Sequence, residues 1–315
     1  MASSKSVVIA ALVANGLIAL LKFIGFLLTG SAAMLSETYH SISDTGNQVF
    51  LLVGIRYSGK DRNREHPFGY GKAQFFYSFL VSVFLFGIAG WESLKHGYNA
   101  ILDPHPPGEG TATLPILDIT FEAVFVNYAV LIGAIVFEAY ALKKAWANMS
   151  RQIDENEWNG IREAFKKTSD VTVLTALTED TIAMAGAGIA LLGVFLSRVT
   201  GNGIYDAVSA ALIGVMLMGF AVALAWENKR LLLGESLPRE DEAELRRIVA
   251  DWEGVDEVVD FRTVFFGTEN VVVTADIALT PDLDTGAMDE TITAIEDAIK
   301  AHRPGVRKVY IEPET

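Results

Sequence analysis

The sequence contains no cysteine, and that absence excludes disulfides, thiolate metal sites and cysteine nucleophiles together. It also contains no GxxxxGK[ST] run, the phosphate-binding loop of many ATPases, so we expect no nucleotide partner. Basic residues are scarce at the end of the chain. From Glu235 onward there are 20 Asp and Glu against 8 Lys and Arg, so −12 of the net charge of −14 lies there. An acidic tail of this kind is not expected to bind nucleic acid or anionic lipid.

Long apolar runs dominate the rest of the chain. Hydrophobic residues make up 51% of the sequence and the mean hydropathy is +0.32, values too high for an ordinary water-soluble protein. A helix needs roughly 20 apolar residues to cross a bilayer. Six segments reach that length, at residues 7–29, 32–57, 75–102, 121–147, 171–196 and 203–226. The sequence therefore predicts an α-helical membrane protein with six transmembrane helices.

The charges in the connections predict how these helices are oriented. Lys and Arg gather after the second, fourth and sixth segments, whereas the other connections hold a single basic residue, Arg198. Because positively charged loops stay in the cytoplasm, we expect both termini on that side. The first segment is too long for a signal peptide, and no Arg-rich presequence precedes it, which favours the plasma (inner) membrane of a prokaryote.

A second, smaller domain follows the last apolar segment. From residue 231 onward, helical periodicity and strand-like alternation follow one another in the order α-β-β-α-β, with Pro238 near the start of the first helix. We therefore expect a transmembrane domain over residues 1–230 and a cytoplasmic α+β domain over residues 231–315. The small sheet of this second domain would offer a face for dimerisation.

Ionisable residues inside two apolar segments are the strongest functional signal. Charged groups at mid-membrane are costly, and they usually line an ion path or pair with one another. His40 and Asp44 are four residues apart and so share one face of a helix, while Asp180, with Glu179 beside it, lies at a comparable depth in the fifth segment. Zinc accepts an imidazole together with carboxylates, whereas magnesium and calcium prefer oxygen ligands alone and more of them. These residues predict a metal or proton site.

Other interpretations of the intramembrane polar residues stay open. Structural pairing with a neighbouring helix also explains a lone intramembrane His or Asp. Glu37 and Glu179 are weaker candidates, and because a helix turns about 100° per residue, Glu179 and Asp180 cannot both point at one centre. Two roles are open for four amides, hydrogen bonding to the metal-binding side chains and ordinary interhelical hydrogen bonding, and we expect the second for Asn15, Asn47, Gln48 and Asn127.

Several motifs resemble those of one family. The run SAAMLSETYHSISDTGN is similar to the second-span signature of the cation diffusion facilitators, which are six-span metal/proton antiporters with a ferredoxin-like cytoplasmic tail. HPFGYGKAQ resembles the family's cytoplasmic loop, and the ED pair together with LLLGESLP is most similar to the branch of the animal mitochondrial zinc exporter. The resemblance covers nearly the whole chain. It implies the family's fold, a homodimer and a secondary active transporter rather than an enzyme.

The resemblance also implies roles for particular residues. His40, Asp44 and Asp180 match the ligands of the family's transport site, but Ala176 stands where many zinc-transporting members have a histidine as fourth ligand. Glu179 or water is left to complete the shell. This acid-rich set keeps Mn²⁺, Fe²⁺ and Co²⁺ open as alternatives to Zn²⁺, although the histidine favours zinc.

Accessory features of the family are only partly present. His66 is retained in the cytoplasmic loop as a possible accessory metal ligand, but neighbouring ligand positions are lost. The tail has a single histidine, His302, so a binuclear metal site is not expected there. In relatives the position of Lys72 forms a charge interlock with the tail junction, so the resemblance implies a pair between Lys72 and Glu235, the nearest acid. A loop lysine placed by the positive-inside rule is the alternative.

The function predicted in this way is proton-coupled export of zinc from the cytoplasm by alternating access. Protons serve as the counter-ion, because they compete with the metal for imidazole and carboxylates, and a histidine with its ordinary pKa of about 6.5 is suited to carry them. Two other classes stay open. An intramembrane zinc hydrolase would normally need more histidines near one another, and a non-transporting membrane metal sensor or scaffold would keep the fold without the ion path.

Overall fold

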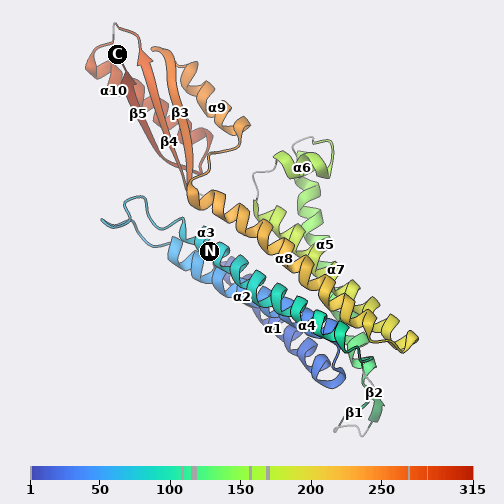
Figure 1. Ribbon diagram of the computed structural model, residues 1–315. Helices are drawn as coiled ribbons and strands as arrows, with labels where there is room; N and C mark the ends of the chain where they lie inside the picture. The colour runs from blue at the N-terminus through green and yellow to red at the C-terminus, as the bar shows by residue number, and fades with distance from the viewer. Residues whose placement is uncertain are drawn as a thin grey trace. The chain divides into compact units, whose positions relative to one another are not determined.

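The computed structural model describes residues 2–107, 110–114, 119–155, 158–167, 171–268, 270–281 and 283–314 (Figure 1). The chain forms two compact units. The first, which we call the membrane unit, comprises Met1–Phe50 and Leu80–Ala225, and the second, the tail unit, comprises Leu51–Phe79 and Trp226–Thr315. Because the chain passes from one unit to the other within three of its helices, each unit is described by itself.

Six long helical segments account for the expected apolar runs. They are α1 (Ala2–Thr29), α2 (Ala32–Ser58), the continuous run of α3 (Ala73–Phe84), the π-helix η1 (Leu85–Gly90) and α4 (Trp91–Leu102), then α5 (Val124–Glu155), α7 (Val171–Thr200) and α8 (Ile204–Leu233). Among the described residues, five of these segments are long and apolar enough to cross a membrane. The exception is α2, whose polar residues lower its hydropathy, although its 27 residues extend over about 40 Å.

The structure corrects the predicted segments at several places. Ahead of α5, an antiparallel hairpin of β1 (Thr111–Leu114) and β2 (Ile119–Glu122) occupies a connection for which the sequence predicts no strand, so α5 begins at Val124 and not at 121. Helices α5 and α8 continue past the expected 147 and 226, and the short α6 (Ile161–Lys167) was not predicted. Hydropathy marks only the apolar part of a helix, and polar residues extend a helix beyond that part.

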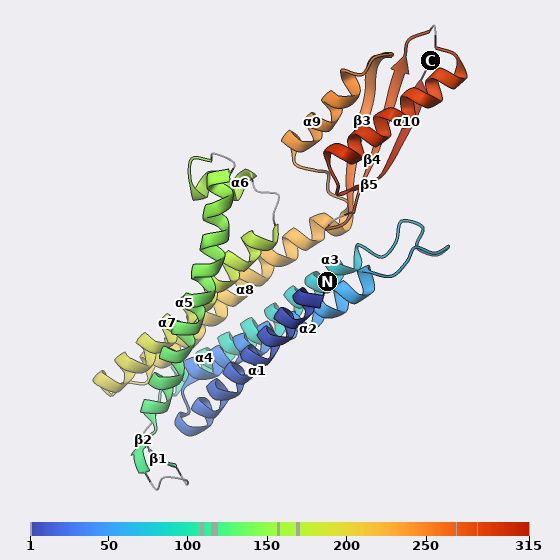
Figure 2. The ribbon, with the colours of Figure 1, turned by 180° about the vertical axis from the view of Figure 1, so that it is seen from behind.

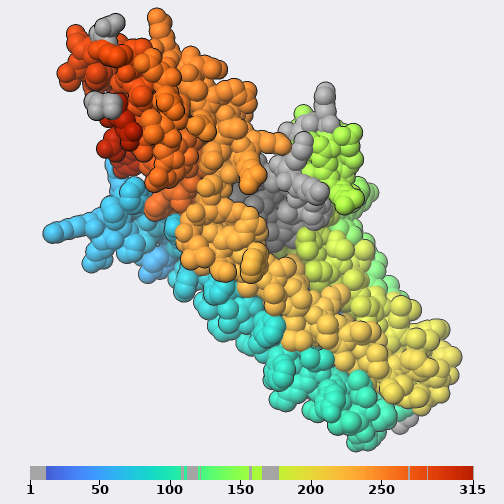
Figure 3. Space-filling view, turned by 45° about the horizontal axis from the view of Figure 1, so that its top comes forward, coloured from blue at the N-terminus to red at the C-terminus, as the bar shows by residue number. Residues whose placement is uncertain are grey.

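Small residues let the helices of the membrane unit approach one another closely. A Cβ added to Gly97 of α4 would lie 2.8 Å from the Cα of Ala211 in α8, and one added to Gly214 would lie 2.9 Å from the Cα of Leu94. The surfaces of the two segments adjoin in Figure 3, where residues near 90 are teal and α8 is yellow to orange. Inside a bilayer such van der Waals packing holds helices together, because lipid tails are as apolar as side chains.

Polar links between helices add to this packing. Asp206 of α8 accepts hydrogen bonds from the Ser31 hydroxyl and from the Ala32 backbone N–H, both at 2.6 Å, and so satisfies the N-terminal end of α2. Just before that end, Gly30 makes the tight turn from α1 with a positive φ of 66°. The Asn127 amide of α5 donates to the Thr29 hydroxyl of α1 at 2.9 Å, which is the interhelical role expected for this asparagine.

The tail has the predicted order of elements. α9 (Arg239–Ala250) follows Pro238, and then come β3 (Val255–Gly267), β4 (Asn270–Leu279), α10 (Thr285–His302) and β5 (Val306–Glu314). The sheet has the order β3-β4-β5, with β3 antiparallel and β5 parallel to the central β4. Both helices lie on one face of this sheet, the face that is turned toward the viewer in Figure 2.

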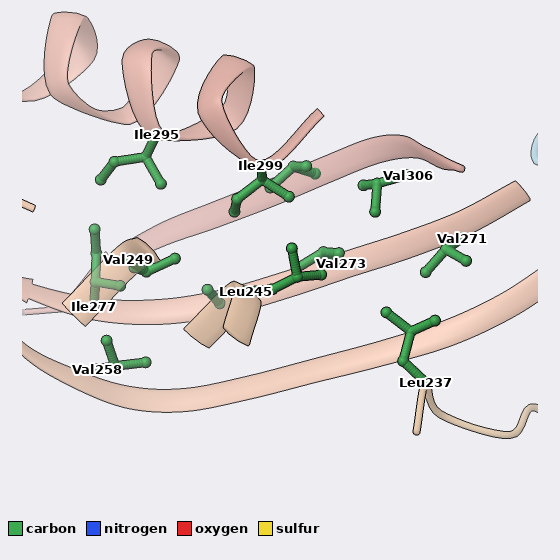
Figure 4. Packing of buried hydrophobic residues seen from close by; sticks show 12 residues of the cluster. Leu237, Leu245, Val249, Val258, Val271, Val273, Ile277, Ile295, Ile299 and Val306 are labelled. Carbon is green, nitrogen blue, oxygen red and sulfur yellow. The ribbon is translucent and has the colours of Figure 1, made fainter. Parts of the chain in front are cut away.

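An apolar core joins these helices to the sheet. Val273 and Ile277, two positions of the same face of β4, lie beneath Ile295 and Ile299 of α10, and all four are fully buried (Figure 4). Leu245 of α9 packs into the same cluster. The apolar faces of α9 and α10 thus pack on the apolar face of the sheet in one core, which confirms the predicted α+β tail.

Candidate functional site

The first part of the site lies on α2, where the helix carries its most polar turn. His40 and Asp44 lie one turn apart on one face, with Nε2 of His40 3.7 Å from Oδ2 of Asp44. His40 is 2% exposed, and neither of its ring nitrogens has a hydrogen-bond partner among the described residues. A buried imidazole without hydrogen-bond partners is energetically costly, and a neutral imidazole has one nitrogen lone pair with which it can bind an external ligand.

Helix α7 contributes the second part. Glu179 accepts a 3.4 Å hydrogen bond from the Asn47 amide, which links α7 to α2 a little beyond Asp44. The neighbouring Asp180 interacts electrostatically with both Asp44 and Glu179. The carboxylates of the two helices therefore share one electrostatic environment. Ala176, which stands where many zinc-transporting relatives have a histidine, belongs to α7, but its side chain lies outside the described residues.

The described imidazole and carboxylate groups of α2 and α7 do not form a complete set of metal ligands. In the part of the chain that the structure describes, no group of three His, Asp or Glu side chains is close enough to hold a metal ion. The arrangement differs from a structural zinc site, in which four donors surround the ion permanently. A site of this open kind must close around an ion to hold it.

Two ionisable residues near this site were missed in the sequence. Lys22 of α1 forms a buried ion pair with Glu37, and Glu138 of α5 interacts electrostatically with Asp44, His40 and Lys22. Both residues interrupt apolar runs, at 7–29 and 121–147. An ionisable residue in a membrane span is itself a functional signal, and that signal would have identified both of them.

The cytoplasmic loop and the tail histidine have local partners. His66 stacks on Tyr70 with the ring centroids 4.1 Å apart, and the Tyr70 hydroxyl accepts a 2.8 Å hydrogen bond from the Asn63 amide. His66 therefore has an aromatic neighbour where a second ligand would be needed. His302 lies at the end of α10, partly exposed, and its Nε2 is 3.3 Å from Oε1 of Glu244.

Lys72 and Glu235 both belong to the tail unit, and each contacts a different group and not the other residue. The Lys72 ammonium donates to the backbone carbonyl of Leu232, at the end of α8, at 3.3 Å, and it lies 4.8 Å from the ring centroid of Phe266. Glu235 pairs with Arg230. Within a single chain, Lys72 thus stabilises the C-terminal end of α8 through its carbonyl, a favourable position for a cation. The pair expected between Lys72 and Glu235 is not among the ion pairs of the described residues.

An imidazole and several carboxylates buried among apolar membrane helices are typical of membrane proteins that move ions. Comparison with known families identifies the kind. Residues 8–233 match the model described as the cation efflux transmembrane domain, and residues 237–315 match the cation efflux protein cytoplasmic domain. The chain therefore belongs to the cation diffusion facilitators, the family whose motifs its sequence resembles. Members of this family are integral membrane transporters and not enzymes.

The names of individual relatives describe the transported ion differently, as zinc, as a metal or as a cation. The mouse (Mus musculus) "Proton-coupled zinc antiporter SLC30A9, mitochondrial" is 29% identical over 271 residues, which cover 86% of this chain and 45% of the relative. "Metal tolerance protein C4" of Arabidopsis thaliana is 25% identical over 84% of this chain and 54% of its own length. "Cation-efflux pump FieF" of Citrobacter koseri is 26% identical over 81% and 74%. The chain spans about half the length of the first two relatives.

Proposed function

We propose that this protein is a proton-coupled antiporter that exports a divalent metal ion, preferentially zinc, from the cytoplasm. The observation that carries this proposal is the buried His40, whose ring nitrogens have no hydrogen-bond partner among the described residues, together with Asp44 beside it and the carboxylates of α7 that interact with α2. An imidazole within a carboxylate set suits zinc. The zinc antiporters among the relatives support the same cargo.

The mechanism that follows is alternating access. In the inward-open form, His40, Asp44 and Asp180 are deprotonated and close around the ion, with Glu179 or water as the remaining donor. Opening to a more acidic side lets protons bind the same nitrogen and oxygen atoms, and the metal leaves because those atoms can bind only one or the other. The protonated carrier then returns, which makes protons the counter-ion.

The remaining architecture belongs to the same proposal. Helix α2 also crosses the membrane, which brings the number of spans to six. Residues 1–230 form the transport domain. Residues 231–315 form the cytoplasmic domain, through which two copies form a homodimer. Both termini face the cytoplasm of a prokaryotic cell. The matched cytoplasmic-domain model and the acidic tail support this placement.

Flux measurements in proteoliposomes with an imposed pH gradient test the function. We expect zinc uptake to depend on the gradient and to fall at least about 100-fold in Asp44→Asn, since a loss of a few kcal/mol of binding corresponds to that factor. Asp289→Asn, which changes an exposed aspartate of α10, serves as the matched control and is expected to transport at the wild-type rate. Folded wild-type protein without flux of any metal would contradict the proposal and favour a sensor or scaffold.

A second cargo is tested in the same vesicles. The donor set has one histidine and several carboxylates, and such oxygen-rich sets also suit Mn²⁺. Zinc transport that exceeds manganese transport at equal concentration supports the first proposal. The reverse order would assign the protein to manganese while keeping the site.

A further inference from the structure

A lysine is buried in the middle of the first membrane helix. Lys22 is 1% exposed, although its chain neighbours Leu21 and Phe23 are exposed on the outside of the unit. Its ammonium donates to Oε2 of Glu37 at 2.7 Å and to the Ser41 hydroxyl at 2.9 Å. Burying two charges costs several kcal/mol per ion before their attraction is counted. An ion pair kept at this cost within an apolar unit calls for a role beyond holding two helices together.

The partner of this lysine lies between it and α7. Oε2 of Glu37 is bound to Lys22, but Oε1 is buried and has no hydrogen-bond partner among the described residues. This free oxygen lies beside Gly186 of α7, where an added Cβ would be only 2.6 Å away. The absence of a side chain at Gly186 therefore leaves room for the carboxylate. Glu37 is also three residues before His40, which places the two on neighbouring positions of one helix face.

The charge of Lys22 extends to the transport site. It interacts electrostatically with His40, Asp44 and Glu138 as well as with its direct partner. Among the buried side chains that the structure describes, Lys22 is the one Lys or Arg. The carboxylates of Asp44 on α2 and Glu138 on α5 thus share one buried cation with its direct partner Glu37.

We propose that Lys22 is the internal counter-cation of the transport site: it holds Glu37 out of the metal shell and thereby sets how tightly, and for which metal, the site binds. This inference rests on the proposed function. Lys22 is a positioning residue, because it acts on the metal through Glu37 and through its charge. Without the lysine, Glu37 becomes an additional oxygen donor beside His40. Without the glutamate, an unpaired ammonium repels the incoming ion.

The test is a double-mutant cycle on metal affinity, measured by calorimetry with the full-length protein in lipid nanodiscs. Zn²⁺ and Mn²⁺ are titrated separately at one pH. Glu37→Gln is expected to weaken zinc binding about tenfold, the effect of one unit charge at roughly 10 Å in a partly screened interior. Lys22→Met is expected to strengthen it by about the same factor and to raise manganese affinity more than zinc affinity, because the freed carboxylate adds oxygen ligands.

The combined variant separates this role from a purely structural one. Lys22→Met with Glu37→Gln replaces the ion pair by neutral side chains of similar size, a change that buried pairs often tolerate, and we expect zinc affinity to return to within about threefold of wild type. If Lys22→Met alone fails to fold, the comparison of Glu37→Gln with the combined variant still decides. Lys95→Met is the matched control, because it removes an exposed Lys–Glu pair of α4 and should leave both affinities unchanged.

The outcomes distinguish a wrong role for Lys22 from a wrong function for the protein. If Asp44→Asn loses zinc binding while Glu37→Gln and the combined variant bind zinc equally well, the site is real and the role of Lys22 is wrong. If the metal preference of Lys22→Met equals that of the wild type, Glu37 does not become a ligand and the inference is again overturned. A folded wild-type protein that binds neither metal overturns the proposed function and this inference with it.

Discussion

The membrane unit and the tail are held together by different contacts. In the tail, twelve buried residues form one core that consists entirely of Val, Ile, Leu and Ala. In the membrane unit, the tight contacts lie at glycines and alanines, and polar groups such as Asp206 link one helix to the next. The surrounding solvent accounts for the difference. Apolar burial stabilises a fold in water, whereas in lipid the helices gain stability from close packing and hydrogen bonds.

The two regions also differ in how completely their polar groups are satisfied. The buried Thr263 of the tail accepts a hydrogen bond from the Leu237 N–H and donates one to Glu242. Oδ2 of the tail residue Asp241 has no hydrogen-bond partner among the described residues, but it forms an ion pair with Arg303 at 2.6 Å. In the membrane unit, by contrast, both ring nitrogens of His40 and Oε1 of Glu37 are buried without hydrogen-bond partners in the part of the chain that the structure describes. Native proteins tolerate such atoms mainly where they bind something. The membrane unit, where these buried polar atoms lack hydrogen-bond partners, is therefore the region to which we assign the transport site.

The largest effect on stability is expected from the tail core. Ile299→Ala removes a fully buried side chain, and we expect it to lower the free energy of opening of the tail by about 2–5 kcal/mol. Amide hydrogen exchange of β4 in the full-length protein measures this change. Leu192→Ala, on the exposed surface of α7, is the matched truncation; its cost is measured by exchange of the α7 amides and should be less than about 0.5 kcal/mol. Equal costs at the two positions would refute the contrast between water and lipid.

An intermediate effect is expected from the polar link at the start of α2. Asp206→Asn keeps the size of the side chain but turns an amide donor toward either the Ala32 N–H or the Ser31 hydroxyl. We expect a loss of about 1–3 kcal/mol, the cost of leaving a buried polar group unsatisfied. The midpoint of thermal denaturation in detergent reports it, with the exposed Asp103→Asn as control. A midpoint that does not move would show that packing alone positions α2.

The smallest effect is expected at the tail histidine. His302 is partly exposed and its neighbour at 3.3 Å is a single acid, Glu244, so we expect His302→Gln to leave both the zinc stoichiometry and the flux unchanged. Zinc titration of the variant and of the wild type measures the stoichiometry. A loss of one bound zinc per chain in the variant would place a regulatory metal in the tail and remove this distinction between the regions.

Much of the fold is predictable from local patterns, but element boundaries are not. Apolar runs located the long helices, and the predicted α-β-β-α-β order after residue 231 matches α9, β3, β4, α10 and β5. The β1–β2 hairpin and α6 were missed because neither has a long periodic pattern. Of the candidate site, the spacing of His40 and Asp44 already placed them on one face. Lys22 was overlooked because the surrounding helix is otherwise apolar, and a single polar residue barely changes its hydropathy.

The sequence by itself determined the membrane helices, the α-β-β-α-β tail and the shared face of His40 and Asp44, because each depends on residues within a few positions of one another. Only the tertiary structure decided that Lys22 pairs with Glu37, 15 residues away, and that Asp206 binds Ser31 across 175 residues. Such contacts depend on which helices pack together and on which faces. Local periodicity carries no information about that choice, so the charge balance of the candidate site became visible only in the folded chain.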